Sequence, residues 1–136
     1  MKYLFDTDTL SNLLRRAPEP ALVRRLAGTP PEEQATSSIT LGELLYGARR
    51  LDDRGEALAE RIESLLIPNL AVLPFDAEAA RAYGGLRVVL ERAGTPIGDA
   101  DMRIASIALA RDLVVETANT RHFVRIPDLI VENWLA

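Results

Sequence analysis

Carboxylate side chains next to apolar segments are the residues of this chain most suited to metal or acid–base chemistry. The acids concerned come from distant parts of the sequence, and they are Asp6, Glu43, Asp99 and Asp101. The chain has no cysteine and a single histidine, His122. This composition excludes a disulfide scaffold, a thiolate zinc site, a cysteine nucleophile and any site built on several histidines. Carboxylate chemistry is what remains.

The elements that must position these acids alternate between strands and helices. Apolar runs predict strands over residues 2–5, 34–38, 70–73, 113–115 and 129–131. Helical spacing of apolar residues predicts helices over 9–16, 20–27, 41–51, 58–66, 79–93 and 102–110. The alternation predicts an α/β fold with a mainly parallel sheet, helices on both faces and right-handed crossovers. At 136 residues and 48% hydrophobic content, we expect one domain over 1–136 that buries about two-thirds of its surface.

The predicted elements bring the acids toward one edge of the sheet. Asp6 directly follows the first strand, Glu43 falls in the first turn of the helix after the second strand, and Asp101 opens the buried helix. The carboxyl ends of parallel strands form the edge where ligands bind in such sheets. Each acid alone also has a structural explanation. Thr40 and Glu43 have the spacing of a capping box, Asp99 and Asp101 suit a helix N-terminus, and Asp6 or Asp8 could be an N-cap.

A cluster of three ionised carboxylates is unstable without a counter-charge. Two carboxylates about 5 Å apart repel by roughly 3 kcal/mol at an effective dielectric of about 20. Three such pairs approach about 10 kcal/mol, which is comparable with the whole stability of a small domain. Protons or a divalent cation must therefore neutralise the cluster. Oxygen ligands favour Mg²⁺ or Mn²⁺, and such a centre is suited to phosphodiester hydrolysis.

Charge and hydropathy restrict the possible partners only mildly. The net charge of −4 and the pI of about 5.0 argue against a nucleic-acid partner. However, Lys2 is the only lysine, and the other basic residues are arginines, which suit bidentate phosphate contacts. No signal peptide and no apolar run of about 20 residues is evident, so we expect no membrane association and a cytoplasmic protein.

Four motifs together resemble, in order and spacing, those of PIN-domain proteins, and most closely the VapC-type toxins of toxin–antitoxin modules. The motifs lie in Tyr3–Leu10, Ser38–Gly47, Gly94–Ala105 and Thr117–Phe123. The resemblance implies a PIN-like domain with a four- or five-stranded sheet. It also implies an endoribonuclease that depends on Mg²⁺ or Mn²⁺ and often cuts structured RNA such as transfer or ribosomal RNA. A VapB-type antitoxin is the implied partner, and leucine-rich helix faces make a homodimer plausible.

The resemblance also implies roles for individual residues. Asp6, Glu43 and Asp101 match the first three family acids. Asp6 and Asp101 would bind the metal directly, and Glu43 would bind the metal or its water. The hydroxyl groups of Thr7 and Ser38 would orient these acids.

The chain departs from the family pattern near its C-terminus. In the pattern that begins at Thr117, Asn119 occupies the place of a fourth acid, which puts a second tightly bound metal in doubt. Asp99 could compensate as a further metal ligand. His122 stands where relatives often carry Glu, and it is either a proton carrier or an ordinary loop residue. Glu116 is an acid supplied from a strand end, an exposed residue or a local disruption.

Other interpretations differ in what the chain does. Arg87 either reaches a carboxylate or a phosphate, or it is a solvated surface residue. The chain as a whole could be a catalytically inactive PIN-like module that only binds a partner, and Asn119 and Glu116 favour that alternative. A response-regulator-type signalling domain is excluded, because it needs a lysine late in the chain and Lys2 is the only one.

Overall fold

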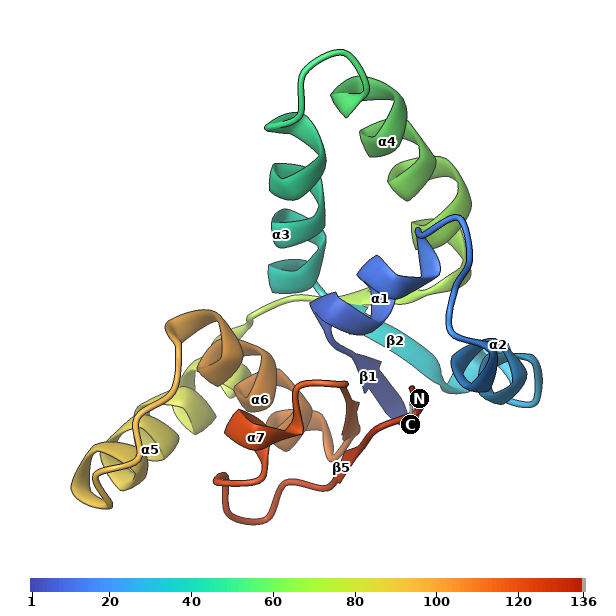
Figure 1. Ribbon diagram of the computed structural model, residues 1–136. Helices are drawn as coiled ribbons and strands as arrows, with labels where there is room; N and C mark the ends of the chain where they lie inside the picture. The colour runs from blue at the N-terminus through green and yellow to red at the C-terminus, as the bar shows by residue number, and fades with distance from the viewer. Residues whose placement is uncertain (136) are drawn as a thin grey trace.

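The computed structural model describes residues 1–135, which form one parallel β-sheet covered by helices on both faces (Figure 1). The sheet has five strands in the order β3-β2-β1-β4-β5, and every pair is parallel. The strands are β1 (Tyr3–Phe5), β2 (Gln34–Ser37), β3 (Ala71–Leu73), β4 (Val114–Glu116) and β5 (Val131–Glu132). The predicted α/β class and the predicted four or five strands are confirmed.

Strand order creates a switch point between β1 and β4. From β1 the chain first builds outward through β2 to β3, and it then returns to the other side of β1 to form β4 and β5. In the registered pairs, Phe5 lies beside Thr36 on one side and beside Glu116 on the other. The crevice beyond the carboxyl ends of two such strands is where open α/β sheets bind ligands. Asp6 and Thr117 directly follow these two strands.

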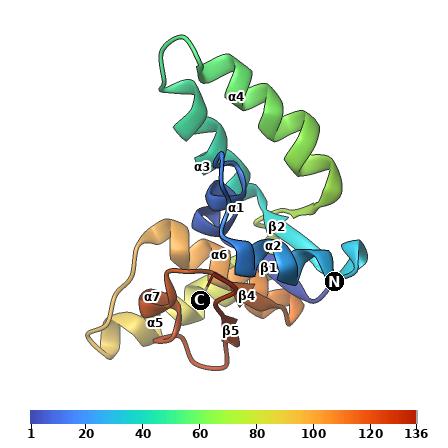
Figure 2. The same ribbon diagram turned by 45° about the vertical axis from the view of Figure 1, so that its right-hand side comes forward.

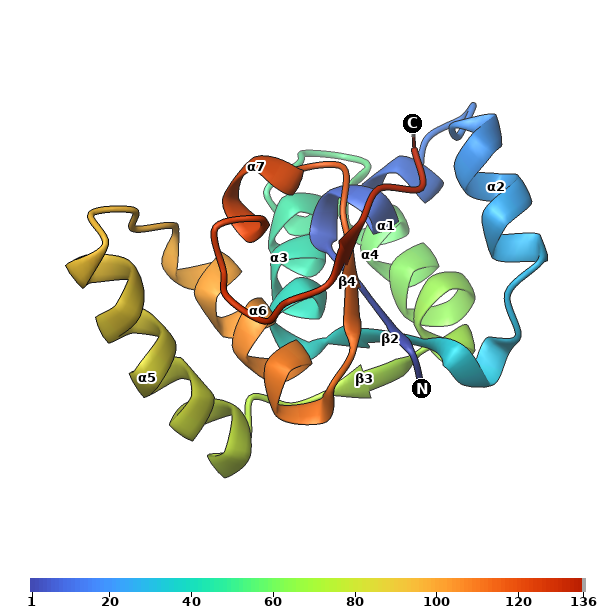
Figure 3. The same cartoon turned by 90° about the horizontal axis from the view of Figure 1, so that it is seen from below.

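Alternation along the strands divides the apolar residues between two cores. Leu4 and Val115 belong to the core beneath α5, α6 and α7. Tyr3, Phe5 and Val114 point to the opposite face and belong to the core beneath α1 to α4. This period of two is what a sheet covered on both faces requires. Figure 3 shows the two sets of helices on either side of the strands.

The six predicted helices are all present, with local differences at their ends, and the short α7 was not predicted. Their bounds are α1 (Thr7–Leu13), α2 (Pro20–Ala27), α3 (Ser38–Arg49), α4 (Gly55–Arg61), α5 (Ala77–Arg92), α6 (Asp99–Arg111) and α7 (Thr120–Phe123). The helix predicted over 58–66 is shorter: α4 is followed by a π-turn (Ile62–Leu66) and a 3₁₀ turn (Ile67–Asn69). Pro68 lies in that last turn and cannot continue the helical hydrogen bonds.

Helices α3 and α4 form an antiparallel arm that extends away from the sheet edge (Figures 1 and 2). The leucine stripe of α3 packs inside this arm, with Leu44 and Ala48 buried beside Leu10 of α1. The apolar spacing that predicted this helix therefore reflects core packing. Among residues 1–135, no helix combines the length and the apolar character needed to cross a bilayer.

Candidate functional site

Asp6 lies at the carboxyl end of β1, in the crevice beside β4. Its backbone N–H donates to the carbonyl oxygen of Glu116 at 3.0 Å, which extends the β1–β4 ladder by one residue. Its side chain accepts a hydrogen bond at Oδ2 from Thr117 Oγ1 at 2.9 Å, and only 5% of the residue is exposed. The first strand thus delivers a carboxylate into a buried position at the switch point.

Asp8 brings a second carboxylate to the same hydroxyl, and sequence reasoning did not assign it to the site. Asp8 Oδ1 lies 3.2 Å from Thr117 Oγ1, which also accepts from the Asn119 backbone N–H at 2.9 Å. The hydroxyl has one proton, so it can donate to only one of the two carboxylates. Burial, together with a hydrogen bond to Asp8, raises the pKa of Asp6 from 3.8 to about 8, against the opposing effects of the Thr7 N–H and the Thr117 hydroxyl. The pair therefore retains a proton unless a cation replaces it.

Glu43 projects from the second turn of α3 toward α1, not from the first turn as predicted. Thr7 Oγ1 lies 2.6 Å from Glu43 Oε1 and 3.2 Å from Thr40 Oγ1. A carboxylate can only accept, so the Thr7 hydroxyl donates to Glu43 and the Thr40 hydroxyl is left to donate to Thr7. The predicted alternative of a capping box between Thr40 and Glu43 is wrong. The cap is Ser37, whose Oγ accepts from the Thr40 N–H at 3.0 Å.

The hydroxyl groups near Glu43 differ in part from those predicted. Thr7 contacts Glu43 directly. Ser38, by contrast, is exposed at the first position of α3, and the buried hydroxyl is that of Ser37. Ser37 ends β2 and caps the helix, whereas Ser38 is the first residue of α3, and only Ser37 is buried.

Asp101 lies in the first turn of α6 and is contacted by His122 of α7. His122 Nδ1 is 3.1 Å from Asp101 Oδ2, and both side chains are partly buried. The same short segment, residues 117–122, therefore provides the partners of both Asp6 and Asp101. Thr117 begins this segment and His122 ends it.

Asp99 does not join these acids, contrary to its predicted role as a compensating metal ligand. One oxygen accepts from the Tyr83 hydroxyl, and the other from Arg103 Nε at 2.7 Å. These two donors hold the pKa of Asp99 below its usual range. Asp99 and Asp101 are two residues apart, which is about 200° around a helix, so they face different directions.

Arg87 belongs to this same exposed network on α5. It donates to the Tyr83 hydroxyl at 3.0 Å and to Glu91 Oε1 at 2.9 Å. It therefore reaches a carboxylate, as one of the two interpretations proposed, but that carboxylate is a neighbour on its own helix. Asn119 is exposed, and its backbone N–H is the group that contacts Thr117.

Glu116 is fully buried at the end of β4, so the interpretation of an exposed residue is wrong. Its Oε2 accepts from the Trp134 backbone N–H at 3.0 Å, while Oε1 and the neighbouring Thr9 Oγ1 are buried without an assigned partner. Burial raises the pKa of this carboxyl. Glu116 thus connects the C-terminal segment to the end of β4 by a hydrogen bond, and its side chain points into the core and not into the crevice.

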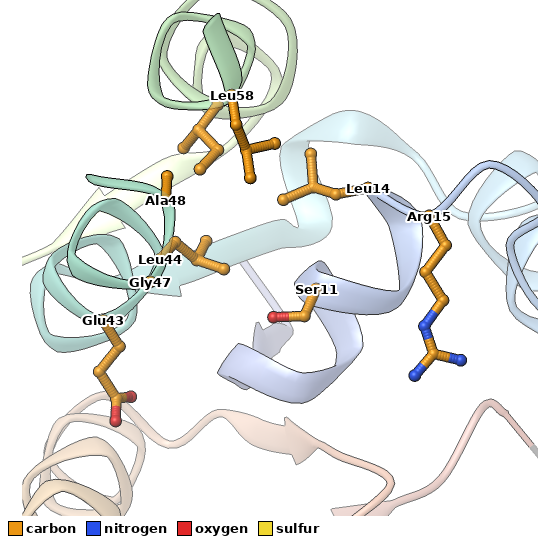
Figure 4. Close-up of a pocket in the computed structure, with 9 residues that line it drawn as sticks. Ser11, Leu14, Arg15, Glu43, Leu44, Gly47, Ala48 and Leu58 are labelled. Atoms are coloured by element: carbon orange, nitrogen blue, oxygen red, sulfur yellow. The ribbon is translucent and has the colours of Figure 1, made fainter. Parts of the chain in front are cut away.

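A partly apolar groove of about 330 Å³ begins beside Glu43 and runs between α1, α3 and α4 (Figure 4). Glu43 and Arg15 lie at its polar border, while Leu14, Leu44 and Leu58 form its apolar wall. Glu43 therefore belongs both to the candidate site and to the wall of this groove.

The side chains that could hold a metal are carboxylates, and each accepts a hydrogen bond from a side chain of another part of the fold. As they stand, no three acidic or histidine groups within residues 1–135 converge on a common metal position. Each acid is instead held by a neighbouring donor: Thr117 for Asp6, Thr7 for Glu43 and His122 for Asp101. The donor set is oxygen, and Asp6 is a buried acid in need of a counter-charge, so the residues fit Mg²⁺ or Mn²⁺.

Comparison with known proteins gives a consistent relationship over nearly the whole chain. The model of the PIN domain family matches residues 3–129. The chain is 38% identical to the tRNA(fMet)-specific endonuclease VapC of Salmonella typhimurium, with 98% of both chains covered. It is 33% identical to the ribonuclease VapC2 of Rickettsia felis, again over 98% of both chains.

Solved structures show the same relationship in three dimensions. The DNA-bound VapBC of Salmonella typhimurium aligns with a TM-score of 0.91 at 37% identity, covering 98% of both chains. FitAcB of Neisseria gonorrhoeae aligns with a TM-score of 0.89 at 32% identity, covering 97% of both chains. These findings confirm the resemblance that the four motifs indicated. The chain belongs to the PIN-domain family and, within it, to the VapC ribonucleases.

Proposed function

We propose that this chain is the ribonuclease toxin of a toxin–antitoxin pair, and that it hydrolyses RNA phosphodiester bonds at a Mg²⁺ or Mn²⁺ ion. Asp6 and Asp101 would bind the ion directly, and Glu43 would bind the ion or its water. The observation that carries this proposal is the buried Asp6 at the β1–β4 switch point, with a pKa raised to about 8 beside Asp8. Because the pair of Asp6 and Asp8 destabilises the metal-free fold at neutral pH, we infer that its negative charge serves to bind a cation.

The chain's own residues prepare the site for a phosphate. When bound, the divalent ion offsets phosphate charge and makes water a stronger nucleophile. Thr117 holds Asp6, and Thr7 holds Glu43 from the adjacent helix, so both carboxylates keep defined positions. Ionisation of Asp6 releases the proton that the pair otherwise retains. Hydrolysis by water leaves a 5′-phosphate and a 3′-hydroxyl, because the ribose 2′-hydroxyl takes no part.

The relatives suggest the substrate and the partner. The Salmonella relative is named as a tRNA(fMet)-specific endonuclease, and a similar solved structure from the same species is a DNA-bound VapBC. We therefore propose structured RNA of the transfer or ribosomal class as substrate and a VapB-type antitoxin as partner. We also propose that the chain acts in the cytoplasm, where such RNA is found. We also propose a homodimer, which light scattering of the purified chain tests directly.

The test is cleavage of end-labelled RNA with Mn²⁺ by the wild type, Asp6→Asn and Asp101→Asn. Asp53→Asn is the matched control, since it makes the same chemical change at an exposed position between α3 and α4. We expect cleavage by the wild type and the control only, with 5′-phosphate ends. Cleavage by either site variant at the wild-type rate would refute the proposed metal site.

A second function, binding without catalysis, is favoured by two features of the chain. No preformed group of three metal-binding side chains exists within residues 1–135, and Asn119 stands where the family resemblance implies a fourth acid. An inactive module would bind the RNA with or without Mn²⁺ and leave it intact. The same assay therefore separates the two functions.

A further inference from the structure

His122 is the only histidine of the chain, and it contacts an acid of the proposed metal site. It lies in α7, a helix of four residues that follows β4 after a short turn. Its Nδ1 is 3.1 Å from Asp101 Oδ2, and the two side chains are 30% and 24% exposed. The contact is therefore partly shielded from solvent, and it joins α7 to α6, the helix that precedes β4 in the sequence.

The atom that carries the proton is the donor in this contact. An ionised carboxylate has no proton to give, so Nδ1 must carry the hydrogen and donate it to Asp101. In the neutral ring, Nε2 is then the unprotonated nitrogen. The other carboxylate oxygen, Asp101 Oδ1, accepts no hydrogen bond from the groups of residues 1–135. One oxygen of Asp101 is thus held by the protein, and the other is available to a ligand.

The place of α7 does not depend on this hydrogen bond. Phe123, the next residue, is fully buried in the core beneath α5 and α6. Ile126, just after the helix, is also buried in that core. These two buried side chains hold α7 in place. The imidazole of His122 is therefore not needed to position the helix, and its hydrogen bond acts on Asp101.

The segment that carries His122 also carries the partner of Asp6. Thr117 Oγ1 donates to Asp6 at one end of the segment, and His122 Nδ1 donates to Asp101 at the other. Metal ligands are generally oriented by such outer hydrogen bonds, and losing one typically costs about 10–100-fold in metal affinity. A single stretch of six residues thereby sets the positions of two acids from separate elements.

We propose that His122 is a positioning residue, whose Nδ1–H holds Asp101 by Oδ2 and leaves Oδ1 to bind the metal ion. This inference rests on the proposed function, because it assumes that Asp101 is a metal ligand.

The test compares His122→Asn, His122→Gln and His122→Ala. The amide nitrogen of Asn can occupy the place of Nδ1, whereas that of Gln reaches the place of Nε2. We expect the Ala and Gln variants to bind Mn²⁺ at least about tenfold more weakly in the absence of RNA, and the Asn variant to remain within about threefold of the wild type. Val124→Ala is the matched control, since Val124 is exposed beside α7.

Two further readouts separate positioning from simple loss of structure. The Mn²⁺ concentration for half-maximal cleavage should rise about tenfold in the Ala and Gln variants, while kcat at saturating Mn²⁺ stays within about twofold. The thermal midpoint should be unchanged. In untagged ¹⁵N-labelled protein the single imidazole gives one pair of nitrogen signals, and we expect these to show a protonated Nδ1.

Each other outcome has a definite meaning. Rescue by Gln instead of Asn, a ring protonated at Nε2 only, or an Ala variant with unchanged Mn²⁺ binding would overturn the positioning role. If the wild type itself neither binds Mn²⁺ nor cleaves RNA, the proposed function fails, and the role of His122 toward a metal fails with it. Normal wild-type binding and cleavage with an unaffected Ala variant refutes only the role of His122.

Discussion

Replacing Asp6 by Asn should make the metal-free protein more stable, and the gain should depend on pH. The folded chain holds the pKa of Asp6 at about 8, against an ordinary value of 3.8, chiefly because the carboxyl is buried. The folded state therefore retains a proton that the unfolded chain releases. By linkage, this makes the free energy of unfolding fall as the pH rises from about 4 to about 8, and leaves it level outside that window.

The size of the effect follows from the shift. At pH 7 the wild type has crossed roughly three pKa units of this window, which corresponds to roughly 4 kcal/mol at about 1.36 kcal/mol per unit. Asn remains neutral throughout, so Asp6→Asn should recover up to that amount at pH 7 and almost nothing near pH 4. The titration belongs to Asp6 and Asp8 together, so Asp8→Asn should recover part of it.

The assay is urea unfolding in EDTA at several pH values, followed by the fluorescence of Trp134. This residue is the only tryptophan and is 3% exposed, so its signal reports global unfolding. Asp53→Asn provides the control for loss of an exposed charge. A constant difference between wild type and Asp6→Asn across the pH range would show that Asp6 ionises normally, and the reasoning would be refuted.

Three further substitutions separate the roles of neighbouring side chains. Glu116→Gln should stabilise the protein by about 1–3 kcal/mol at neutral pH and by little near pH 4, because burial raises the pKa of this carboxyl and one of its oxygens has no partner. The same urea assay measures this gain, and an equal gain at both pH values would contradict the prediction. Asp99→Asn should leave the Mn²⁺ concentration for half-maximal cleavage within about twofold of the wild type, since Asp99 is held by Tyr83 and Arg103. A change of about tenfold would instead indicate that Asp99 is a metal ligand. Thr7→Val should raise the Mn²⁺ concentration for half-maximal cleavage by about tenfold or more, because Glu43 loses its donor; an unchanged titration would place Glu43 outside the site.

The sequence predicts best what depends on local pattern. The strand before Asp6 and the helices around Leu44 and Leu90 follow from apolar runs and spacing, and the structure confirms them. The approach of Asp6 to the β4 edge follows from the general geometry of parallel strands. These features need no knowledge of which distant side chains meet.

What the sequence does not predict depends on side-chain direction and on distant contacts. Asp99 and Asp101 are only two residues apart in the sequence, but helix geometry turns them toward different partners. Glu116 looks like an interruption of an apolar strand, and its burial becomes intelligible only with the N–H of Trp134, eighteen residues later. Asp8 contacts the hydroxyl of Thr117, which lies 109 residues further along the chain, and no local pattern indicates that contact.

The most direct test of the metal site is the anomalous scattering of Mn²⁺ in crystals of the wild-type chain. We predict one strong peak in the crevice between β1 and β4, bound directly by carboxylate oxygens of Asp6 and Asp101, and its loss in Asp6→Asn crystals grown in the same way. A peak held by other acids, or none at Mn²⁺ concentrations that support RNA cleavage, would contradict the proposal that these carboxylates form the catalytic centre.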